Sequence, residues 1–213
     1  MGYFPIFYKN GILILIMKPG KDPKYPINYR SITLLEIPGK IFEHIINRRI
    51  HRLYESKSLF NINQYRFRAK LGTELALTKI NEEVAINQKY KDGCNTVTRD
   101  VTKAFDKVWH NGLRYKLGTT PQIPNLILKI LSSYVRDRTA QIKIRNIIGP
   151  KFELRSGVPQ GGVLSPTLYI IYTADMPLPG NNCVDVAFAD DVTQIIQNFN
   201  NSKDQLAEDT ERD

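Results

Sequence analysis

Two adjacent aspartates, Asp190 and Asp191, follow a strand pattern, and this arrangement restricts the fold more than any other feature of the chain. Every second residue from Val184 to Phe188 is apolar and bulky, which is typical of a half-buried strand. A second apolar run, 192–196, follows the acids, so the pattern predicts a β-hairpin with the aspartates at its tip. Adjacent carboxylates beside apolar strands repel each other unless a cation compensates them. Metal binding would resolve this conflict, and a solvated turn is the alternative.

The charge of the chain indicates the kind of partner. The 213 residues carry a net charge of +9, with 42% hydrophobic residues, which is enough for one or two domains. Lys and Arg in excess favour a polyanion, either nucleic acid or an anionic membrane. The longest apolar run, 11–17, is much shorter than the roughly 20 residues of a membrane helix, so we expect a buried strand there and no membrane partner.

The two cysteines indicate the compartment. Cys94 and Cys183 lie far apart in sequence, and no Cys/His cluster has the spacing of a zinc site. A reducing, intracellular location follows as an expectation, in the nucleus and/or the cytoplasm.

Five segments show the spacing of helices. The first is an amphipathic helix that includes Phe42 to Leu53 and has one apolar stripe. The second helix runs from about Thr73 to Gln88, with three apolar residues expected to face inward. The stripe consists of Phe42, Ile45, Ile46, Ile50 and Leu53, and the inward residues of the second helix are Leu77, Ile80 and Val84. A third helix follows Asp106 as its cap, with Trp109, Leu113 and Leu117 on one face. A fourth spans roughly 124–135, and a fifth begins at Ser165 as N-cap with Pro166 in its first turn.

Further strands are expected at 141–148 and 151–154, where they would pair. Strands interleaved with helices of this length predict a mixed α/β or α+β fold.

Three segments carry the residues of a known family. Asp100 to Asp106 (DVTKAFD), Ser156 to Pro166 (SGVPQGGVLSP) and Phe188 to Asp191 (FADD) resemble, in order, the first catalytic motif, the nucleotide-site motif and the second catalytic motif of reverse transcriptases. The segments 2–5, 18–23, 29–35, 64–77 and 108–113 are similar to those of non-long-terminal-repeat retrotransposons, with jockey-like elements as the group that fits best. The resemblance extends to about Ile196.

The resemblance implies a fold and a division of the chain. The expected fold is α+β, a polymerase palm with an antiparallel sheet and helices on one face, plus fingers, with the thumb missing. Residues 1–95 would form mainly the fingers with connecting helices, 96–197 the palm with the catalytic motifs, and 198–213 a polar tail. The implied activity is that of an RNA-directed DNA polymerase, a nucleotidyltransferase.

The resemblance also implies a metal site. Asp100 and Asp190 would be shared ligands of two Mg²⁺ ions, with Asp191 as the third acid and the carbonyl of Val101 as a further contact. Mn²⁺ is the expected substitute for Mg²⁺. The chemistry agrees, because two such ions activate a 3′-hydroxyl and stabilise the charge on the transferred phosphate and the leaving pyrophosphate. Asp106 is the competing acid, and its position before a helix favours a capping role.

Five residues are expected to contact the incoming deoxynucleotide. By resemblance, the Phe105 ring excludes a 2′-hydroxyl, Gln160 and Gly161 contact the nucleotide, and Lys18 with Arg30 binds its triphosphate. Each has a simpler alternative. Phe105 would be a core residue, Gln160 and Gly161 part of a plain turn, and the two basic residues solvated or in contact with the template backbone.

Arg68 is expected to contact the template, and the expected partners are an RNA template, a DNA primer and deoxynucleotides. Two other functions are open. A viral RNA-directed RNA polymerase shares the acids, but Ala189 and Phe105 argue against it. A basic, catalytically inactive remnant that binds nucleic acid is the second alternative.

Several residues depart from the family pattern. Ser31 replaces a usual Pro, Arg66 a Gly, and Gly162 a common Ser, while Leu71 and Gly72 replace a His-Ser pair. Arg99 stands directly before Asp100, where an apolar residue is expected. A buried cation there is costly unless it pairs with an acid.

Overall fold

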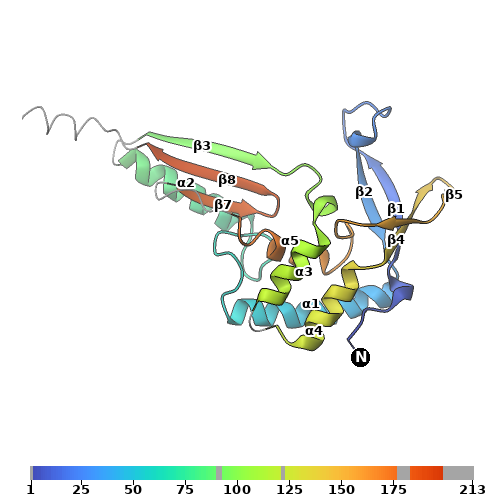
Figure 1. The fold of residues 1–213 in the computed structure, drawn as a ribbon. Helices are drawn as coiled ribbons and strands as arrows, with labels where there is room; N and C mark the ends of the chain where they lie inside the picture. Colours follow the sequence, from blue (N-terminus) through green and yellow to red (C-terminus); the bar gives the residue numbers. More distant parts are fainter. Residues whose placement is uncertain (1, 90–92, 121–122, 177–182, 199–213) are drawn as a thin grey trace, which may run out of the picture. The chain divides into compact units, whose positions relative to one another are not determined.

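The structure, a computed structural model, describes residues 2–89, 93–120, 123–176 and 183–198. The chain forms two compact units (Figure 1). Unit 1 comprises Met1–Asn61 and Thr102–Asp175, and unit 2 comprises Ile62–Val101 and Met176–Asp213. The predicted division into fingers at 1–95 and palm at 96–197 stays a prediction. Of the predicted polar tail, Asn198 ends a strand and 199–213 lie outside the described residues.

Unit 1 contains a mixed sheet. Its strands are β1 (Asn10–Met17), β2 (Tyr29–Leu34), β4 (Arg138–Ile144), β5 (Ile147–Ile148) and β6 (Phe152–Leu154). β1 pairs antiparallel with β2 and parallel with β4, and β4 also pairs with β5 and β6. The predicted first strand is therefore present, but its expected burial is wrong for Leu15 to Met17, which are exposed. In Figure 1 the β1–β2 hairpin projects away from the helices of unit 1, which explains this exposure.

Four α-helices of unit 1 supply most of its core. They are α1 (Ile37–Ser56), α3 (His110–Thr119), α4 (Asn125–Val135) and α5 (Ser165–Tyr172), with three 3₁₀ turns, η1 (Ile6–Tyr8), η2 (Pro26–Asn28) and η3 (Ala104–Lys107). Ile50, Leu113, Leu131 and Leu168 are almost fully buried. The predicted inward residue Ile45 of α1 is 50% exposed, because the buried face runs through Glu43, Ile46 and Ile50 instead.

The predicted start of α3 is wrong. The helix begins at His110, and its N-cap position is Trp109, which is 61% exposed rather than inward. Asp106 lies in η3 and provides no cap, because its carboxylate accepts a hydrogen bond from another part of unit 1. Leu113 and Leu117 are buried, as predicted.

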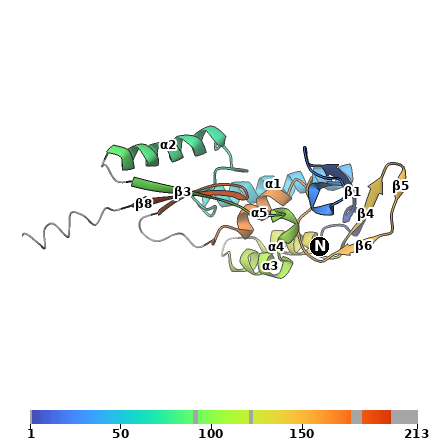
Figure 2. The same cartoon turned by 90° about the horizontal axis from the view of Figure 1, so that it is seen from above.

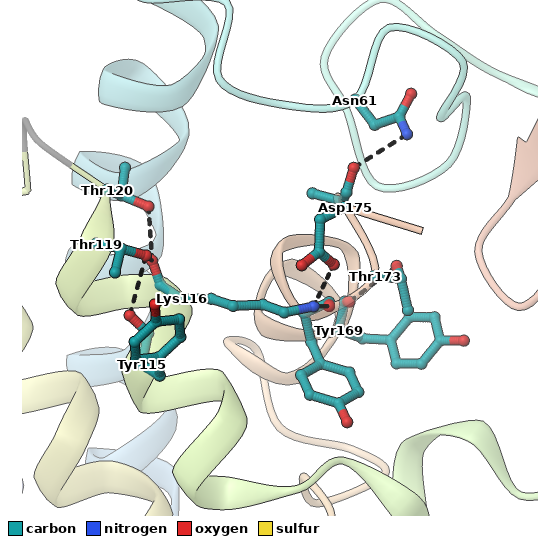
Figure 3. Close-up of polar contacts among 10 residues, drawn as sticks. Asn61, Tyr115, Lys116, Thr119, Thr120, Tyr169, Thr173 and Asp175 are labelled. Carbon is teal, nitrogen blue, oxygen red and sulfur yellow. Dashed lines mark hydrogen bonds and ion pairs between the residues drawn. The ribbon is translucent and has the colours of Figure 1, made fainter. Parts of the chain in front are cut away.

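The C-terminal end of α5 is tied to α3 by one lysine (Figure 3). Lys116 Nζ donates to the carbonyl of Tyr172 and to the carboxylate of Asp175. A cation near the last turn of a helix is favourable because the helix carbonyls there lack backbone partners. Asn61 Nδ2 donates to the carbonyl of Ala174, 3.2 Å away, which fixes the residues that follow the helix.

The described part of unit 2 contains a three-stranded antiparallel sheet covered by one helix. The strands β3 (Gly93–Asp100), β8 (Asp191–Asn198) and β7 (Cys183–Phe188) lie in this order, and Figure 2 shows α2 (Thr73–Lys89) along one face. The predicted hairpin is confirmed, since Phe188 pairs with Asp191. The predicted inward position of Leu77 is wrong, as it is 54% exposed. The predicted α+β class is confirmed.

The buried face of α2 includes polar residues whose groups find partners within the helix. Glu83 accepts from Lys79 Nζ at 2.6 Å, and its carbonyl accepts from Asn87 Nδ2 at 2.7 Å. These bonds allow Glu83 and Asn87 to be buried, which turns Leu77 outward.

Candidate active site

The three predicted catalytic aspartates lie at one end of the sheet of unit 2. Asp100 is the last residue of β3 and is the direct partner of Asp191, the first residue of β8. Opposed residues of antiparallel strands place their Cβ atoms about 4.5–5.5 Å apart on the same face. Asp190 is the second residue of the turn between β7 and β8, and Val101 follows β3 directly. The sheet register therefore gathers the acids, although about ninety residues separate Asp100 from the other two in sequence.

The two opposed carboxylates suit Mg²⁺. Asp100 and Asp191 are exposed, so their oxygens are accessible. Mg²⁺ keeps several waters and binds proteins through one or two carboxylates together with substrate phosphates. Within the described ranges, no three His, Cys, Asp or Glu side chains are grouped closely enough to hold a metal ion. The exposed carboxylates of Asp100 and Asp191 are of the type and number that Mg²⁺ takes from a protein when substrate phosphates supply its other ligands.

Arg99, the basic departure beside Asp100, pairs with Asp185 rather than with any of the three predicted catalytic acids. Its Nη2 lies 3.9 Å from Oδ2 of Asp185 on β7. Burial raises the pKa of the Asp185 carboxyl, and the charge of Arg99 counteracts this effect. The arginine is exposed, so the cost expected for a buried cation does not arise.

The turn that carries Asp190 has an unusual backbone. Ala189 has φ of +63°, a backbone conformation that residues other than glycine rarely adopt. The side-chain amide of Gln64 contacts both backbone groups of this residue: Ala189 N donates to Gln64 Oε1 at 2.9 Å, and Gln64 Nε2 donates to the Ala189 carbonyl at 3.3 Å. Sequence reasoning missed Gln64, because no local pattern marks a glutamine whose partner is 125 residues away.

The nucleotide-site motif forms a tight loop in unit 1. Gly157 has φ of +84° and donates its N–H to the Val108 carbonyl at 2.8 Å. Gly161 has φ of +121°, and a Cβ on it would lie 2.5 Å from the Thr33 carbonyl oxygen. Thr33 N donates to the Gln160 carbonyl at 2.6 Å. The Thr33–Gln160 bond therefore anchors the loop on β2, and only a glycine at 161 permits the close approach to Thr33.

Gln160 is held by Asp106. Its Nε2 donates to Asp106 Oδ1 at 3.0 Å, and this contact replaces the predicted helix cap. Phe105, the neighbour of Asp106, stacks on Tyr169 with ring centroids 4.9 Å apart and an angle of 23° between the planes. Phe105 is half-buried, so the ring is supported by α5 and still partly accessible.

A buried carboxylate supports the same loop from α1. Glu43 is 1% exposed, and its Oε2 accepts the Leu164 N–H at 3.0 Å, directly before α5. Ser165 provides no helix cap, which corrects the prediction: the N-cap position is Leu164, and the Ser165 hydroxyl faces the Tyr134 hydroxyl at 3.5 Å. Burial raises the pKa of Glu43, and the bond from Leu164 is the largest opposing effect.

This cluster also explains Gly162, the departure from a common Ser. A Cβ at Gly162 would lie 2.7 Å from both the Tyr134 and Ser165 hydroxyl oxygens and 3.2 Å from Glu43 Oε2. A side chain at 162 would therefore displace the polar groups that support α5.

A cavity of about 340 Å³ lies beside Gln160 in unit 1. Its lining includes Ser31 and Thr33 of β2, Asp106, Arg138, and residues 153–160, which comprise the end of β6 and the loop that follows it. Lys18 and Arg30 are not among the lining residues. Lys18 donates its N–H to the Asn28 carbonyl at 2.8 Å, and Arg30 is paired with Ile16 in the β1–β2 hairpin. The structure thus joins Gln160 and Gly161 to Asp106 and Thr33, with the two basic residues further along the hairpin.

Arg68, predicted to contact the template, lies in unit 2 and is half-buried. Its Nη1 is 3.5 Å from the carbonyl of Gln64. Its template contact stays a prediction.

Comparison with solved structures defines the class of fold. The chain resembles the apo telomerase of Candida tropicalis truncated from its C-terminal domain, with a TM-score of 0.64 at 16% sequence identity over 94% of this chain and 46% of the telomerase chain. The predicted polymerase palm fold is confirmed by this similarity.

Sequence comparison then gives the family. Residues 16–212 match the reverse transcriptase (RNA-dependent DNA polymerase) family, and the chain belongs to it. The chain is 37% identical over 194 residues to a probable RNA-directed DNA polymerase from transposon X-element of Drosophila melanogaster, covering 89% of this chain and 21% of the relative. It is 33% identical over 180 residues to the RNA-directed DNA polymerase from mobile element jockey of the same species, and this match covers 83% of this chain and 19% of the relative.

The predicted resemblance to jockey-like, non-long-terminal-repeat elements is confirmed by these relatives. The chain spans about a fifth of their length.

Proposed function

We propose that the chain carries the polymerase site of a retrotransposon reverse transcriptase, which adds deoxynucleotides to a primer 3′-hydroxyl along an RNA template. The observation that supports this proposal most directly is the cross-strand pair of Asp100 and Asp191, with Asp190 in the adjoining turn. Membership of the reverse transcriptase family supports the reaction type.

In this proposal Asp100, Asp190 and Asp191 hold two Mg²⁺ ions, with the carbonyl of Val101 as a further contact, and Mn²⁺ is an acceptable substitute. When bound, such ions lower the pKa of the attacking hydroxyl and stabilise charge on the phosphate and the leaving pyrophosphate. The contribution of the chain is to hold the carboxylates at fixed positions on paired strands, so that little rearrangement is needed on binding.

The residues of unit 1 would bind and select the nucleotide. We propose that the Phe105 ring, supported by Tyr169, limits the space at the 2′ position of the sugar. Gln160, oriented by Asp106, and the exposed backbone of Gly161 would contact the sugar and base. The ring would favour deoxynucleotides by volume, because a 2′-hydroxyl would have to displace well-packed atoms.

Basic residues would bind the phosphates and the nucleic acid. Lys18 and Arg30 lie on one hairpin, where a point charge and a bidentate guanidinium suit a triphosphate. Arg68 is proposed to contact the template backbone.

With such substrates the protein would act inside the cell, in the nucleus and/or the cytoplasm, which agrees with Cys94 and Cys183 being free thiols. Among the described residues, no helix combines the length and apolar character needed to cross a bilayer.

Primer extension tests the proposal. The full chain is incubated with an RNA template, an annealed DNA primer, deoxynucleotides and Mg²⁺ or Mn²⁺. We expect Asp190→Asn to reduce incorporation by about a hundredfold or more, since it removes a ligand charge without changing shape. The matched control is Asp137→Asn, an exposed aspartate in unit 1 whose φ of +53° asparagine tolerates. Equal incorporation by both variants would refute the catalytic assignment.

Nucleic-acid binding without catalysis is the second candidate, favoured by the net charge of +9. It predicts no incorporation by the unmodified chain, together with binding of the template-primer that weakens steeply as salt is raised. Asp190→Asn would leave that binding unchanged or slightly tighter, because it removes one negative charge.

A further inference from the structure

A short segment of unit 2 runs along the outer edge of the hairpin that carries Asp190. Ala187 N donates to the Asn63 carbonyl, and Tyr65 N donates to the Ala187 carbonyl, each at 2.8 Å. Gln64 and Ala187 thereby form a parallel bridge on the free side of β7. The segment 63–66 is thus attached to the strand just before the turn.

From this position Gln64 reaches the turn itself. Its amide oxygen accepts the Ala189 N–H at 2.9 Å and the Arg66 N–H at 3.0 Å, while its amide nitrogen donates to the Ala189 carbonyl at 3.3 Å. The residue is 4% exposed. If the oxygen and nitrogen of the amide were exchanged, the NH₂ group would face the N–H groups of Ala189 and Arg66, and no hydrogen bond could form there. These two partners therefore determine the orientation of the amide.

Arg66 adds a second contact with the same hairpin. Its guanidinium carbon lies 4.9 Å from the ring centroid of Phe188, the residue before Ala189. The departure from the usual Gly at position 66 therefore places a cation over the aromatic residue at the end of β7.

The turn needs such support because of its backbone conformation. Ala189 has φ of +63° without being a glycine, and surrounding structure must maintain this conformation. The observed bonds from Gln64 satisfy the N–H and the carbonyl of that one residue, and both groups take part in setting the direction in which Asp190 leaves the turn.

We propose that Gln64 is a positioning residue for the catalytic aspartates: it holds Ala189 in the left-handed conformation that orients Asp190 and Asp191. This inference rests on the proposed function for its catalytic consequence, whereas the effect on the turn is independent of it. Gln64 touches no substrate in this scheme and acts only through the backbone of the turn.

The test compares Gln64→Met, which keeps the length of the side chain and removes its hydrogen bonds, with Gln88→Met at an exposed position of α2. In primer extension by the full chain, we expect Gln64→Met to lower kcat about ten- to a hundredfold, with KM for the deoxynucleotide changed less than about threefold, because the acids are misplaced while the nucleotide contacts remain. Mn²⁺ binding, measured by electron paramagnetic resonance without nucleotide, should weaken several-fold.

A second substitution separates positioning from general loss of structure. Glycine adopts positive φ without steric cost, so Ala189→Gly combined with Gln64→Met should restore much of kcat and of Mn²⁺ affinity. Amide hydrogen exchange at residue 189 should be faster in Gln64→Met than in the unmodified chain.

The outcomes are distinguishable. Values of kcat, Mn²⁺ affinity and exchange that match those of Gln88→Met would overturn the proposal, and so would a loss that Ala189→Gly does not restore. If the unmodified chain incorporates no nucleotide, the proposed function fails, while Mn²⁺ affinity and exchange at residue 189 still decide the role of Gln64.

Discussion

Gly161→Ala should destabilise unit 1 strongly, because this glycine combines an unusual φ with a close backbone contact. At φ of +121° an alanine carries strain of about 1–3 kcal/mol. Its Cβ would lie 2.5 Å from the Thr33 carbonyl oxygen, and relieving such overpacking costs about 1–3 kcal/mol more. The expected loss is therefore about 2–6 kcal/mol in the free energy of unfolding.

Two glycines of the same unit provide matched controls. Gly20 has φ of +68° with nothing within 4 Å of an added Cβ, so Gly20→Ala should cost only about 1 kcal/mol of backbone strain. Gly118, near the end of α3, has neither positive φ nor a neighbour within 4 Å, so Gly118→Ala should stabilise by up to about 1 kcal/mol.

Urea unfolding followed by far-ultraviolet circular dichroism measures all three variants. With a slope of about 1–3 kcal/mol per molar urea, Gly161→Ala should lower the midpoint by about 1 M or more. Primer extension should also show a higher KM for the deoxynucleotide, because the loop must leave β2 to relieve the contact. A midpoint for Gly161→Ala no lower than that of Gly20→Ala would refute the close-contact argument.

Three further predictions concern side chains of unit 1. Burial raises the pKa of Glu43 above its ordinary value of 4.5, so the stabilisation from protonated Glu43 is complete below pH 4.5 and is lost as the pH rises through the raised pKa. The urea midpoint of the unmodified chain should therefore fall as the pH rises from 4.5 through the raised pKa. Glu43→Gln, which does not titrate, should show no such fall. Lys116→Met should lower the unfolding free energy by about 1–2 kcal/mol, against no measurable change for the exposed Lys107→Met, and equal midpoints would contradict the tether at the end of α5. Phe105→Val should raise ribonucleotide use relative to deoxynucleotide use by about tenfold in paired primer-extension assays, and an unchanged ratio would favour a purely structural ring.

Local patterns predicted the elements better than their contacts. The alternation from Val184 to Phe188 located the β7–β8 hairpin, and the apolar runs located β1 and α4. The two expected caps were wrong for the same reason. Asp106 and Ser165 are both cap-forming types in the right places, but partners 54 and 31 residues away, Gln160 and Tyr134, take their side chains.

The candidate site shows the same limit. The motif order singled out three aspartates whose catalytic role stays a prediction. The pairing of β3 with β8, which places Asp100 opposite Asp191, can be anticipated once the hairpin is known. Glu43 and Gln64 were not predicted, because each acts on backbone groups more than a hundred residues away and belongs to no spacing pattern. Glu43 even occupies the apolar face of a helix, where a charge argues against burial until its partners are seen.

The segment 63–66 has a consequence for how copies of the chain behave toward one another. β7 is the outer strand of the sheet of unit 2, and such a strand offers unpaired main-chain groups to any neighbouring chain. On that side, the Ala187 N–H is bonded to the Asn63 carbonyl, and the Ala187 carbonyl is bonded to the Tyr65 N–H. If this segment detached, the outer edge of β7 would have unpaired main-chain groups that can pair with a strand of another copy. The contact between residues 63–66 and β7 therefore holds the turn with the aspartates and also opposes self-association.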